Sequence, residues 1–511
     1  MKYLYLRRLC QFLCAAMVIY IIWETRYPAD RSINARYIFH IDPLVMFMTA
    51  ISERLLIAGL ITASVTLLLT LLLGRFFCGW ICPLGASMDF LSMLLKPVYR
   101  LMRIRPAETG PGRARFSRYM VLFVIFGFAV FGVQIAWILD PVTLFFRAFS
   151  MNIHPFLTRS IDNMFITLLR VSDFNPFIEN LHVSLSNSIL GPSVPRFPHA
   201  DVILALFIVS VFTAALKRRW WCRYVCPLGA LLSLPARFSP FTRTVKSCRS
   251  GCSLCRHNCR TGAIRQDNSY VREECILCLD CIVFCPGQES FFSFKRSHRE
   301  IEPEASEKIT RSRFLKLIFI LLAPGIPVPG RGNTKASGTE KRGELIRPPG
   351  SLDEHEFIQR CIRCGNCMKV CPTNVLQPAL LEAGAAGVWT PFLDTGIGYC
   401  EYNCNLCGSV CPTGAIKNIT LAEKHVTKIG LAVINKELCL PWAKQENCIV
   451  CEEHCPTTEK AILLREKRLQ SGEIIRLPVI DPGLCIGCAI CEFKCPTEPD
   501  RAVTVKITRS K

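Results

Sequence analysis

Four long apolar stretches in the first half of the chain predict helices that cross a membrane. They cover residues 9–23, 55–73, 119–139 and 202–216. The second and third are 19 and 21 residues long, and about 20 apolar residues span the hydrocarbon core of a bilayer. The first and fourth have 15 residues each, so a buried or interfacial helix is the alternative for these two. The pattern predicts a four-helix transmembrane bundle.

The basic residues between these stretches predict how the bundle is oriented. Seven Lys or Arg occur in the 29 residues of 90–118, but only four in the 62 residues of 140–201. Because cytoplasmic loops carry an excess of Lys and Arg, residues 90–118 and both ends of the bundle are expected in the cytoplasm. The net charge of +21 is therefore attributed mainly to topology, and no nucleic-acid partner is expected.

The two halves of this region repeat a sequence motif. Residues 75–86 and 219–230 share the pattern Arg-x2-Cys-x3-Cys-Pro-Leu-Gly-Ala, and each motif closes an apolar stretch. Each half also has an Asp-Pro step, Asp42-Pro43 and Asp140-Pro141, on the predicted outer side. The bundle is thus expected to be a duplicated two-helix module with paired cysteines at the cytoplasmic surface.

The chain has 30 cysteines, and 24 of them follow the fourth apolar stretch in six groups of four. The groups are Cys248, Cys252, Cys255 and Cys259; Cys275, Cys278, Cys281 and Cys285; Cys361, Cys364, Cys367 and Cys371; Cys400, Cys404, Cys407 and Cys411; Cys439, Cys448, Cys451 and Cys455; Cys485, Cys488, Cys491 and Cys495. In five groups proline follows the last cysteine. This spacing is typical of bacterial ferredoxins, in which three cysteines hold one [4Fe–4S] cube and the fourth ligates a partner cube.

The spacing therefore predicts six [4Fe–4S] clusters held in pairs. Structural zinc is the alternative for a single group, but six groups of the three-plus-one kind indicate iron–sulfur chemistry. By this rule Cys285 completes the cluster of the first group, and Cys259 completes that of the second. The last four groups could pair in order or nest, and the sequence leaves both arrangements open.

Six further cysteines lie in or beside the apolar stretches. Cys78 and Cys82, like Cys222 and Cys226, have the i, i+4 spacing that places side chains on one face of a helix. Together these four could bind one further metal centre; a redox-active dithiol, copper handling and simple packing are the alternatives. Cys10 and Cys14 share the spacing without a duplicate, so packing is the interpretation there.

The quoted motifs resemble those of NapH- and NapG-type membrane ferredoxins, which are related to the polyferredoxin part of NosR. Residues 1 to about 290 look like NapH, with four spans and two Cys-x3-Cys-Pro elements. Residues from about 310 look like NapG, with Ile346-Arg-Pro-Pro-Gly350 leading into the Cys361 group. The resemblance implies a fusion of the two and an electron carrier between the quinone pool and a partner oxidoreductase or cytochrome.

The expected fold is therefore multidomain, with a transmembrane bundle and α+β ferredoxin domains. We assign residues 1–240 to the four-span membrane domain, 241–295 to a cytoplasmic two-cluster ferredoxin domain, 296–350 to a linker, and 351–511 to a four-cluster ferredoxin domain. The linker contains Arg311-Ser312-Arg313 before a short apolar run, a degenerate form of a twin-arginine export signal. It favours a periplasmic C-terminal domain at a bacterial inner membrane, with a cytoplasmic location as the alternative.

Two functions are compatible with these features. The first is a quinol dehydrogenase component that relays electrons between quinol and a partner. Asp42 and Asp140 are then candidate catalytic proton acceptors, although Asp before Pro is also a normal helix cap. The second is an assembly factor that supplies electrons to a metal cofactor such as copper. None of the nine histidines lies in the four stretches, which argues against a bis-histidine haem there.

Overall fold

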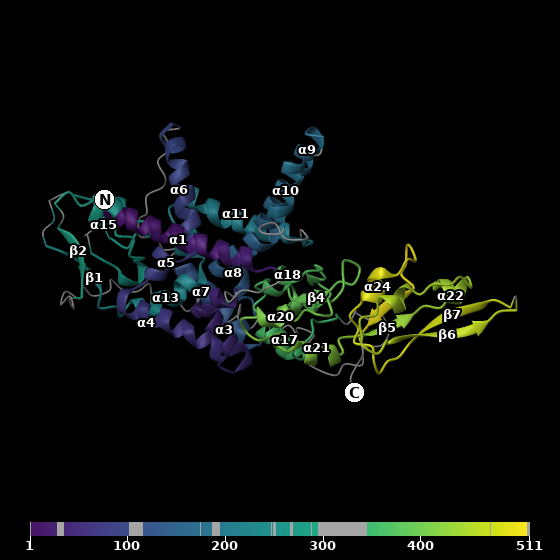
Figure 1. Cartoon of the computed structure of the whole chain (residues 1–511). Helices are drawn as coiled ribbons and strands as arrows, with labels where there is room; N and C mark the ends of the chain where they lie inside the picture. The colour runs from purple at the N-terminus through teal and green to yellow at the C-terminus, as the bar shows by residue number, and fades with distance from the viewer. Residues whose placement is uncertain are drawn as a thin grey trace. The chain divides into compact units, whose positions relative to one another are not determined.

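The computed structural model describes residues 2–507 except 28–34, 102–115, 174, 187–194, 247, 249–251, 266–268, 288, 295–344 and 471. Figure 1 colours the chain by residue number. The chain forms two compact units: Met1–Ile22, Arg36–Asn152 and His199–Asn333 make the first, and Trp23–Ala35, Ile153–Pro198 and Thr334–Lys511 the second. Residues 153–198, most of the segment between the third and fourth apolar stretches, thus belong with the C-terminal cysteine-rich part. Most of the predicted linker lies outside the described residues.

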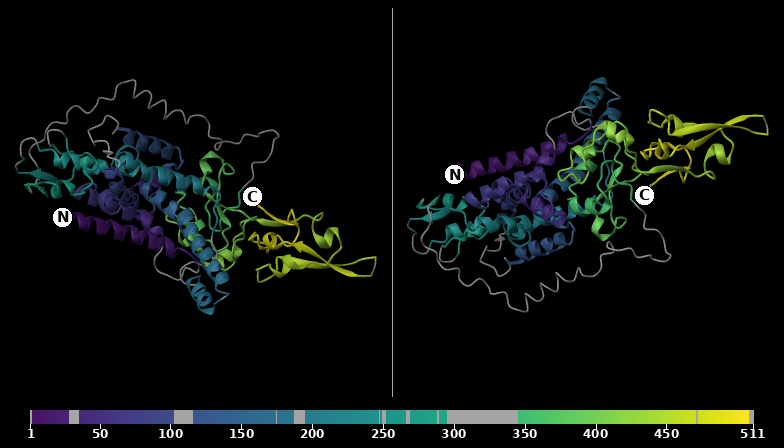
Figure 2. Two further views of the ribbon diagram at one scale, coloured as in Figure 1. Left: turned by 90° about the horizontal axis from the view of Figure 1, so that it is seen from above. Right: turned by 90° about the horizontal axis from the view of Figure 1, so that it is seen from below.

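The first unit is built mainly from apolar helices. Helix α11 packs on α6 and α8, helix α13 on α4 and α7, and α3 on α7. The helices are α1 (Lys2–Glu24), α2 (Arg36–His40), α3 (Pro43–Glu53), α4 (Ala63–Leu73), α5 (Phe76–Trp80), α6 (Pro83–Leu101), α7 (Ser117–Val130), α8 (Pro141–Ala148), α11 (Ala200–Leu216), α12 (Trp220–Tyr224) and α13 (Pro227–Ala236). Figure 2 gives two further views of this arrangement.

These helices differ in length from the predicted spans. Among the described residues, α1, with 23 residues, is the one helix long and apolar enough to cross a membrane, whereas α4, α7 and α11 have 11, 14 and 17 residues. The prediction of one continuous helix over 119–139 is wrong. Helix α7 ends at Val130, and Gly132 takes a left-handed conformation (φ 78°) that turns the chain.

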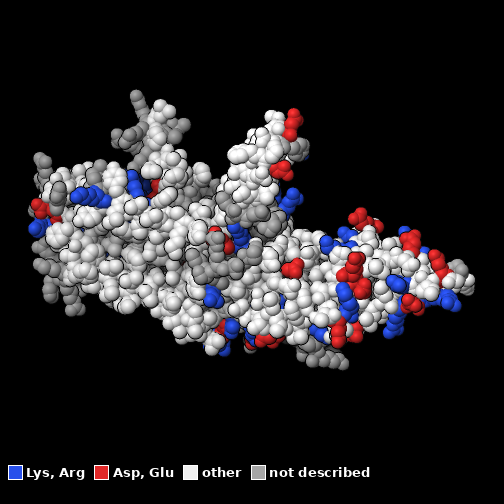
Figure 3. Space-filling view, in the orientation of Figure 1, with Lys and Arg blue, Asp and Glu red and all other residues white. Residues whose placement is uncertain are grey.

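The helices of the first unit expose apolar side chains and bury polar ones. Helix α1 exposes Leu9 and Phe12 but buries Arg7 and Gln11. Helix α4 repeats the pattern, because it buries Thr66 and Thr70 and exposes Leu68, Leu71 and Leu72. The face of this unit seen in Figure 3 accordingly has large uncharged areas. This distribution is the reverse of that expected for a helix facing water.

A small ferredoxin domain follows α13 in the same unit. Strand β1 (Thr242–Val245) pairs antiparallel with β2 (Ser290–Ser293), with Thr242 opposite Ser293. Between them lie the short helices α14 (Leu254–His257) and α15 (Asp280–Val283). Loop segments and single helical turns therefore carry the cysteines.

The second unit contains two more ferredoxin-like arrangements and the helices α9 (His154–Val171) and α10 (Pro176–Leu185). Its sheets are antiparallel pairs: β3 (Leu376–Pro378) with β4 (Pro391–Leu393), β5 (Leu431–Ile434) with β8 (Val503–Lys506), and β6 (Ile462–Arg468) with β7 (Ile474–Ile480). The helices are α17 (Glu354–Arg360), α18 (Asn366–Val370), α19 (Gly384–Gly387), α20 (Leu406–Ser409), α21 (Leu421–Val426), α22 (Leu440–Ala443), α23 (Val450–Glu453) and α24 (Ile490–Lys494).

Candidate iron–sulfur sites

Five cavities in the described chain are each lined by four cysteines. The sets are Cys259, Cys275, Cys278 and Cys281; Cys361, Cys364, Cys367 and Cys411; Cys371, Cys400, Cys404 and Cys407; Cys439, Cys448, Cys451 and Cys495; Cys455, Cys485, Cys488 and Cys491. Each cavity combines three cysteines of one group with the last cysteine of another. The last four groups therefore pair in order, and the nested arrangement is excluded.

Left-handed residues between the cysteines curve the backbone around each cavity. Leu277 and Leu279 have φ angles of 52° and 61°, and Gly487 and Ala489 have 76° and 66°. Such angles are rare outside glycine. They occur here between the cysteines of one cavity, where the backbone has to curve around it. A short helix then begins at the third cysteine or beside it, as α24 does before Cys491.

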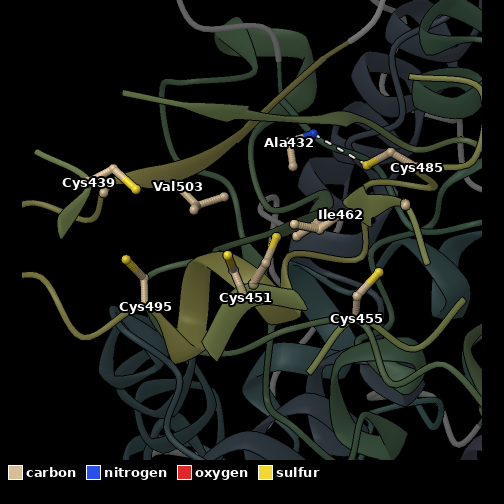
Figure 4. Close-up of a cluster of buried hydrophobic side chains, with 11 residues drawn as sticks. Ala432, Cys439, Cys451, Cys455, Ile462, Cys485, Cys495 and Val503 are labelled. Carbon is tan, nitrogen blue, oxygen red and sulfur yellow. Dashed lines mark hydrogen bonds between the residues drawn. The ribbon is translucent and has the colours of Figure 1, made fainter. Parts of the chain in front are cut away.

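Backbone amides donate hydrogen bonds to the cysteine sulfurs. Leu277 N lies 3.3 Å from Cys275 Sγ, and Ala263 N lies 3.1 Å from Cys259 Sγ. Figure 4 shows the bond from Ala432 N to Cys485 Sγ, 3.5 Å long, beside other cysteines that line the last two cavities. Hydrogen bonds to the sulfurs stabilise the charged thiolate and help set the reduction potential of a bound cluster.

The residue after the Cys-Pro step is a site feature that the sequence analysis missed. Four groups end in Cys-Pro-Thr, and the threonine hydroxyls lie 3.2 to 3.9 Å from the cysteine sulfurs. These threonines are Thr373, Thr413, Thr457 and Thr497. The repeated tripeptide was the available signal, because a hydroxyl at that position can donate to a thiolate.

Burial makes the free thiolates unfavourable in these cavities. It raises the pKa of the Cys400 thiol to about 11 and that of Cys451 to about 12. Desolvation is the largest cause in both cases. A thiolate that is costly alone is stabilised when iron coordinates it, because the metal supplies the compensating charge. The donor sets therefore fit [4Fe–4S] clusters.

The remaining quartet, Cys248, Cys252, Cys255 and Cys285, is more exposed to solvent than the other five. Cys255 is buried, Cys252 and Cys285 are half-buried and Cys248 is exposed. Residues 247 and 249–251 lie outside the described part. A cluster held by these four cysteines stays a prediction.

The four cavities of the second unit follow one another in a defined order. Shared groups couple the first cavity (Cys361 set) to the second (Cys371 set), and the third (Cys455 set) to the fourth (Cys439 set). The second and third meet directly, because Cys400 N donates a 2.9 Å hydrogen bond to Cys488 O. The order is therefore Cys361 set, Cys371 set, Cys455 set, Cys439 set.

The first cavity pair also contacts the segment 153–198 of its own unit. Lys369 Nζ lies 2.9 Å from His154 Nδ1, and Asn374 Nδ2 donates to Arg196 O at 2.8 Å. Burial and the nearby Arg26 lower the pKa of Lys369 to about 7. Burial is also the largest reason why the pKa of His154 falls to about 3. The imidazole is therefore neutral at pH 7.

The cysteines of the two Cys-x3-Cys-Pro elements have a different local structure from the predicted one. Cys78 and Cys222 lie in α5 and α12, whereas Cys82 and Cys226 lie outside these helices, immediately before the prolines that begin α6 and α13. A shared helical face required each helix to continue through both cysteines, and it does not, because a residue before proline is pushed out of the helical conformation. All four are buried. Cys10 and Cys14 are half-buried neighbours on α1.

Asp42 and Asp140 occupy equivalent places in the two halves. Asp42 Oδ1 accepts from Leu44 N at 2.8 Å, and Asp140 Oδ2 accepts from Thr143 N at 2.7 Å, so both are helix caps as the alternative interpretation held. The two carboxyl groups also interact electrostatically with each other. Among the described residues, Asp42 Oδ2 and Asp140 Oδ1 have no hydrogen-bond partner, and both residues are fully buried. A proton shared between Asp42 Oδ2 and Asp140 Oδ1 would link the two carboxyl groups by a hydrogen bond.

Ferredoxin folds with cysteine quartets of this kind define the chain as an iron–sulfur polyferredoxin. A family model described as a 4Fe-4S binding domain matches residues 55–101 and 202–246, one described as a 4Fe-4S dicluster domain matches 360–415, and the NosR model matches 246–296. The ferredoxin-type protein NapG of Escherichia coli K12 is 32% identical over 207 residues, which cover 39% of this chain and 87% of NapG. The chain belongs to the NapG family of ferredoxin-type proteins.

Other relatives have related descriptions. The methylamine utilization ferredoxin-type protein MauM of Methylobacillus flagellatus is 35% identical over 153 residues, 30% of this chain and 64% of MauM. The regulatory protein NosR of Pseudomonas aeruginosa is 28% identical over 214 residues, 41% of this chain and 24% of NosR. The search of solved structures gives no match. The chain is thus an iron–sulfur electron-transfer protein.

Proposed function

We propose that this protein is a membrane-bound relay that takes electrons from quinol and passes them through its clusters to a partner oxidoreductase. The observation that carries the proposal is the contiguous series of four cysteine-lined cavities in the second unit. A single soluble carrier needs one or two clusters, whereas an ordered series connects two separate redox partners. The protein supplies the positions and potentials, and the clusters carry out the electron transfer.

The outside-in distribution of apolar residues supports a membrane location for the first unit. The helices α1, α4, α7 and α11 expose large apolar side chains such as Leu9, Leu68, Phe126 and Phe212. In water this surface would promote aggregation, whereas in a bilayer it contacts lipid tails. We propose that all four helices cross or enter the membrane. The short helices α3 and α8 would fill the interior between them.

A direct test uses the full chain purified in detergent without oxygen. A quinol analogue is added, and the absorbance of the clusters is followed with and without an artificial acceptor. Reduction by quinol and continued turnover with the acceptor are expected. An iron–sulfur-loaded protein that quinol leaves oxidised would contradict the relay and favour the assembly-factor alternative.

The contacts of segment 153–198 support a periplasmic location for the C-terminal domain. This segment follows α8 and precedes α11, within residues 140–201, whose few basic residues predict the outside. The other end of α11 leads to the motif of Cys222 and Cys226 and to the ferredoxin domain of 241–295. Because Lys369 and Asn374 contact this outer segment, we propose that residues 351–511 lie outside and residues 241–295 inside.

Protease treatment of right-side-out spheroplasts is expected to cleave the exposed loops of residues 351–511 while residues 241–295 stay intact. The measurement is a western blot with one tag on the C-terminus and one inserted within residues 241–295. A C-terminal tag that is cut only after the membrane is permeabilised would place the domain in the cytoplasm. Cleavage of both tags in intact spheroplasts would show leaky membranes and require a cytoplasmic marker enzyme as the control.

A further inference from the structure

The two Arg-x2-Cys-x3-Cys-Pro-Leu-Gly motifs of the first unit lie against each other and together form one buried site. Burial brings Cys78, Cys82, Cys222 and Cys226 into one interior, where each interacts electrostatically with cysteines of the other half. Two cysteines come from each repeat. The motif is therefore complete only when both halves are present.

The arginine of each motif reaches the cysteines of both halves. Arg75 Nη2 lies 3.9 Å from Cys78 Sγ, and Arg219 Nη1 lies 4.0 Å from Cys222 Sγ. Arg75 also interacts with Cys226, and Arg219 with Cys82. Both arginines are almost fully buried. Two guanidinium groups thus lie beside four sulfurs.

The glycine of each motif makes room for the arginine of the other. A Cβ atom at Gly85 would lie 2.3 Å from Arg219 Nη1, and one at Gly229 would lie 2.7 Å from Arg75 Nη2. A side chain at either glycine would displace the guanidinium group of the other half from its place beside the sulfurs, so the crossing of the arginines explains the glycines of the Cys-Pro-Leu-Gly sequence. Glycine at these two positions leaves room for the two guanidinium groups beside the cysteine sulfurs.

The charges around this centre favour a negatively charged bound group. Among the described residues, arginines outnumber acids in this interior: Arg7, Arg75, Arg118, Arg219, Arg223 and Arg260 against Asp89, Glu274 and Asp280. Buried cations without compensation are costly. Four thiolates around an oxidised [4Fe–4S] core carry two net negative charges, whereas four neutral thiols or two disulfides carry none.

Two further observations favour a cube over a single ion. No group of three or more His, Cys, Asp or Glu in the described residues lies close enough to hold one metal ion, and this is as true of the ferredoxin quartets as of these four cysteines. The 4Fe-4S binding model matches 55–101 and 202–246, and each match contains only two cysteines. A cube needs four, so the two matches have to be used together.

We propose that Cys78, Cys82, Cys222 and Cys226 ligate one [4Fe–4S] cluster shared between the two halves, a seventh cluster at the base of the membrane unit. The neighbouring ferredoxin cluster would be its redox partner. A Cβ atom at Gly79 would lie 2.0 Å from Ile276 O, and Trp80 Nε1 donates to Leu277 O at 3.0 Å. The loop that carries Cys275 and Cys278 therefore lies directly on α5.

The inference rests on the proposed relay only for its role, and metal content tests it separately. The full chain is purified anaerobically, and iron, zinc and protein are measured together with Mössbauer spectra. About 28 iron atoms per chain, all in cubes, are expected for seven clusters, against about 24 for six. A double variant, C82A/C226A, is expected to lose about four iron atoms and one cluster signal.

The matched control is C10A/C14A, which changes two cysteines with the same spacing in the same membrane unit. It is expected to keep all its iron. Unchanged iron in a normally inserted C82A/C226A protein would overturn the inference, and so would one zinc atom per wild-type chain that this variant loses. If the variant does not accumulate, the wild-type count is compared with that of Cys252→Ala, which removes only the cluster of the exposed quartet. About 24 iron atoms in the wild type and about 20 in Cys252→Ala leave no seventh cluster. All these outcomes are measured as metal content, so they do not depend on whether quinol reduces the clusters.

Discussion

Replacing Cys407 with alanine is expected to stop electrons between the two halves of the C-terminal domain. Cys407 lines the cavity of the Cys371 set, so the variant loses that cluster and about four iron atoms. The Cys371 set is the one that meets the next pair, through the bond from Cys400 N to Cys488 O. Quinol should then leave the two distal clusters oxidised, whereas dithionite reduces every remaining cluster. Freeze-quench electron paramagnetic resonance after quinol addition measures the difference.

A matched variant removes the same amount of iron from the end of the series. Cys448 lines the fourth cavity, and Cys448→Ala is expected to leave the other three clusters of the second unit reducible by quinol. If Cys407→Ala and Cys448→Ala both allowed the cluster of Cys455, Cys485, Cys488 and Cys491 to be reduced at the wild-type rate, the order derived from the contacts would be wrong. Electrons would then enter elsewhere.

The cysteine quartets were predictable from the sequence because their chemistry is local. Three cysteines two residues apart can wrap only one cube, and the fourth has to leave for a partner. The five cavities have the three-plus-one cysteine linings that this rule predicts. Which groups pair was not predictable, since ordered and nested pairs satisfy the same spacing. The bond from Cys400 to Cys488 depends on how two complete ferredoxin folds pack, and no motif encodes it.

In the first unit, hydropathy predicted where most apolar helices lie but not where they end or which short helices accompany them. Apolar runs predicted the positions of α1, α4, α7 and α11, but the run 119–139 includes Gly132, whose left-handed conformation ends the helix early. The half-helices α3 and α8 were missed because they contain no long run. Their Asp-Pro starts were noticed, yet only the structure shows that the two caps face each other. Similarly, the role of Gly85 and Gly229 depends on arginines about 130 to 150 residues away.

Asp140→Asn is expected to slow quinol-driven reduction of the clusters by about 10²- to 10⁴-fold, the usual contribution of a general base. Quinol oxidation releases two protons, and we propose that the Asp42–Asp140 pair accepts one of them through the oxygens that have no hydrogen-bond partner in the described part of the chain. Asparagine retains an oxygen that can accept the bond from Thr143 N, so the cap survives. Its amide would donate to Asp42 and occupy the place of the shared proton. Stopped-flow absorbance with a quinol analogue gives the rate.

The controls for this variant separate proton transfer from folding. Dithionite bypasses quinol, so reduction by dithionite and the iron content should match those of the wild type. Asp162→Asn changes another aspartate of the outer segment, which is paired with His182 at 2.8 Å and partly exposed, and it should leave the quinol rate unchanged. Asp42→Asn should resemble Asp140→Asn because the halves are equivalent. Normal quinol rates in both pair variants would restrict the two aspartates to capping their helices, and the proton acceptor would have to lie elsewhere.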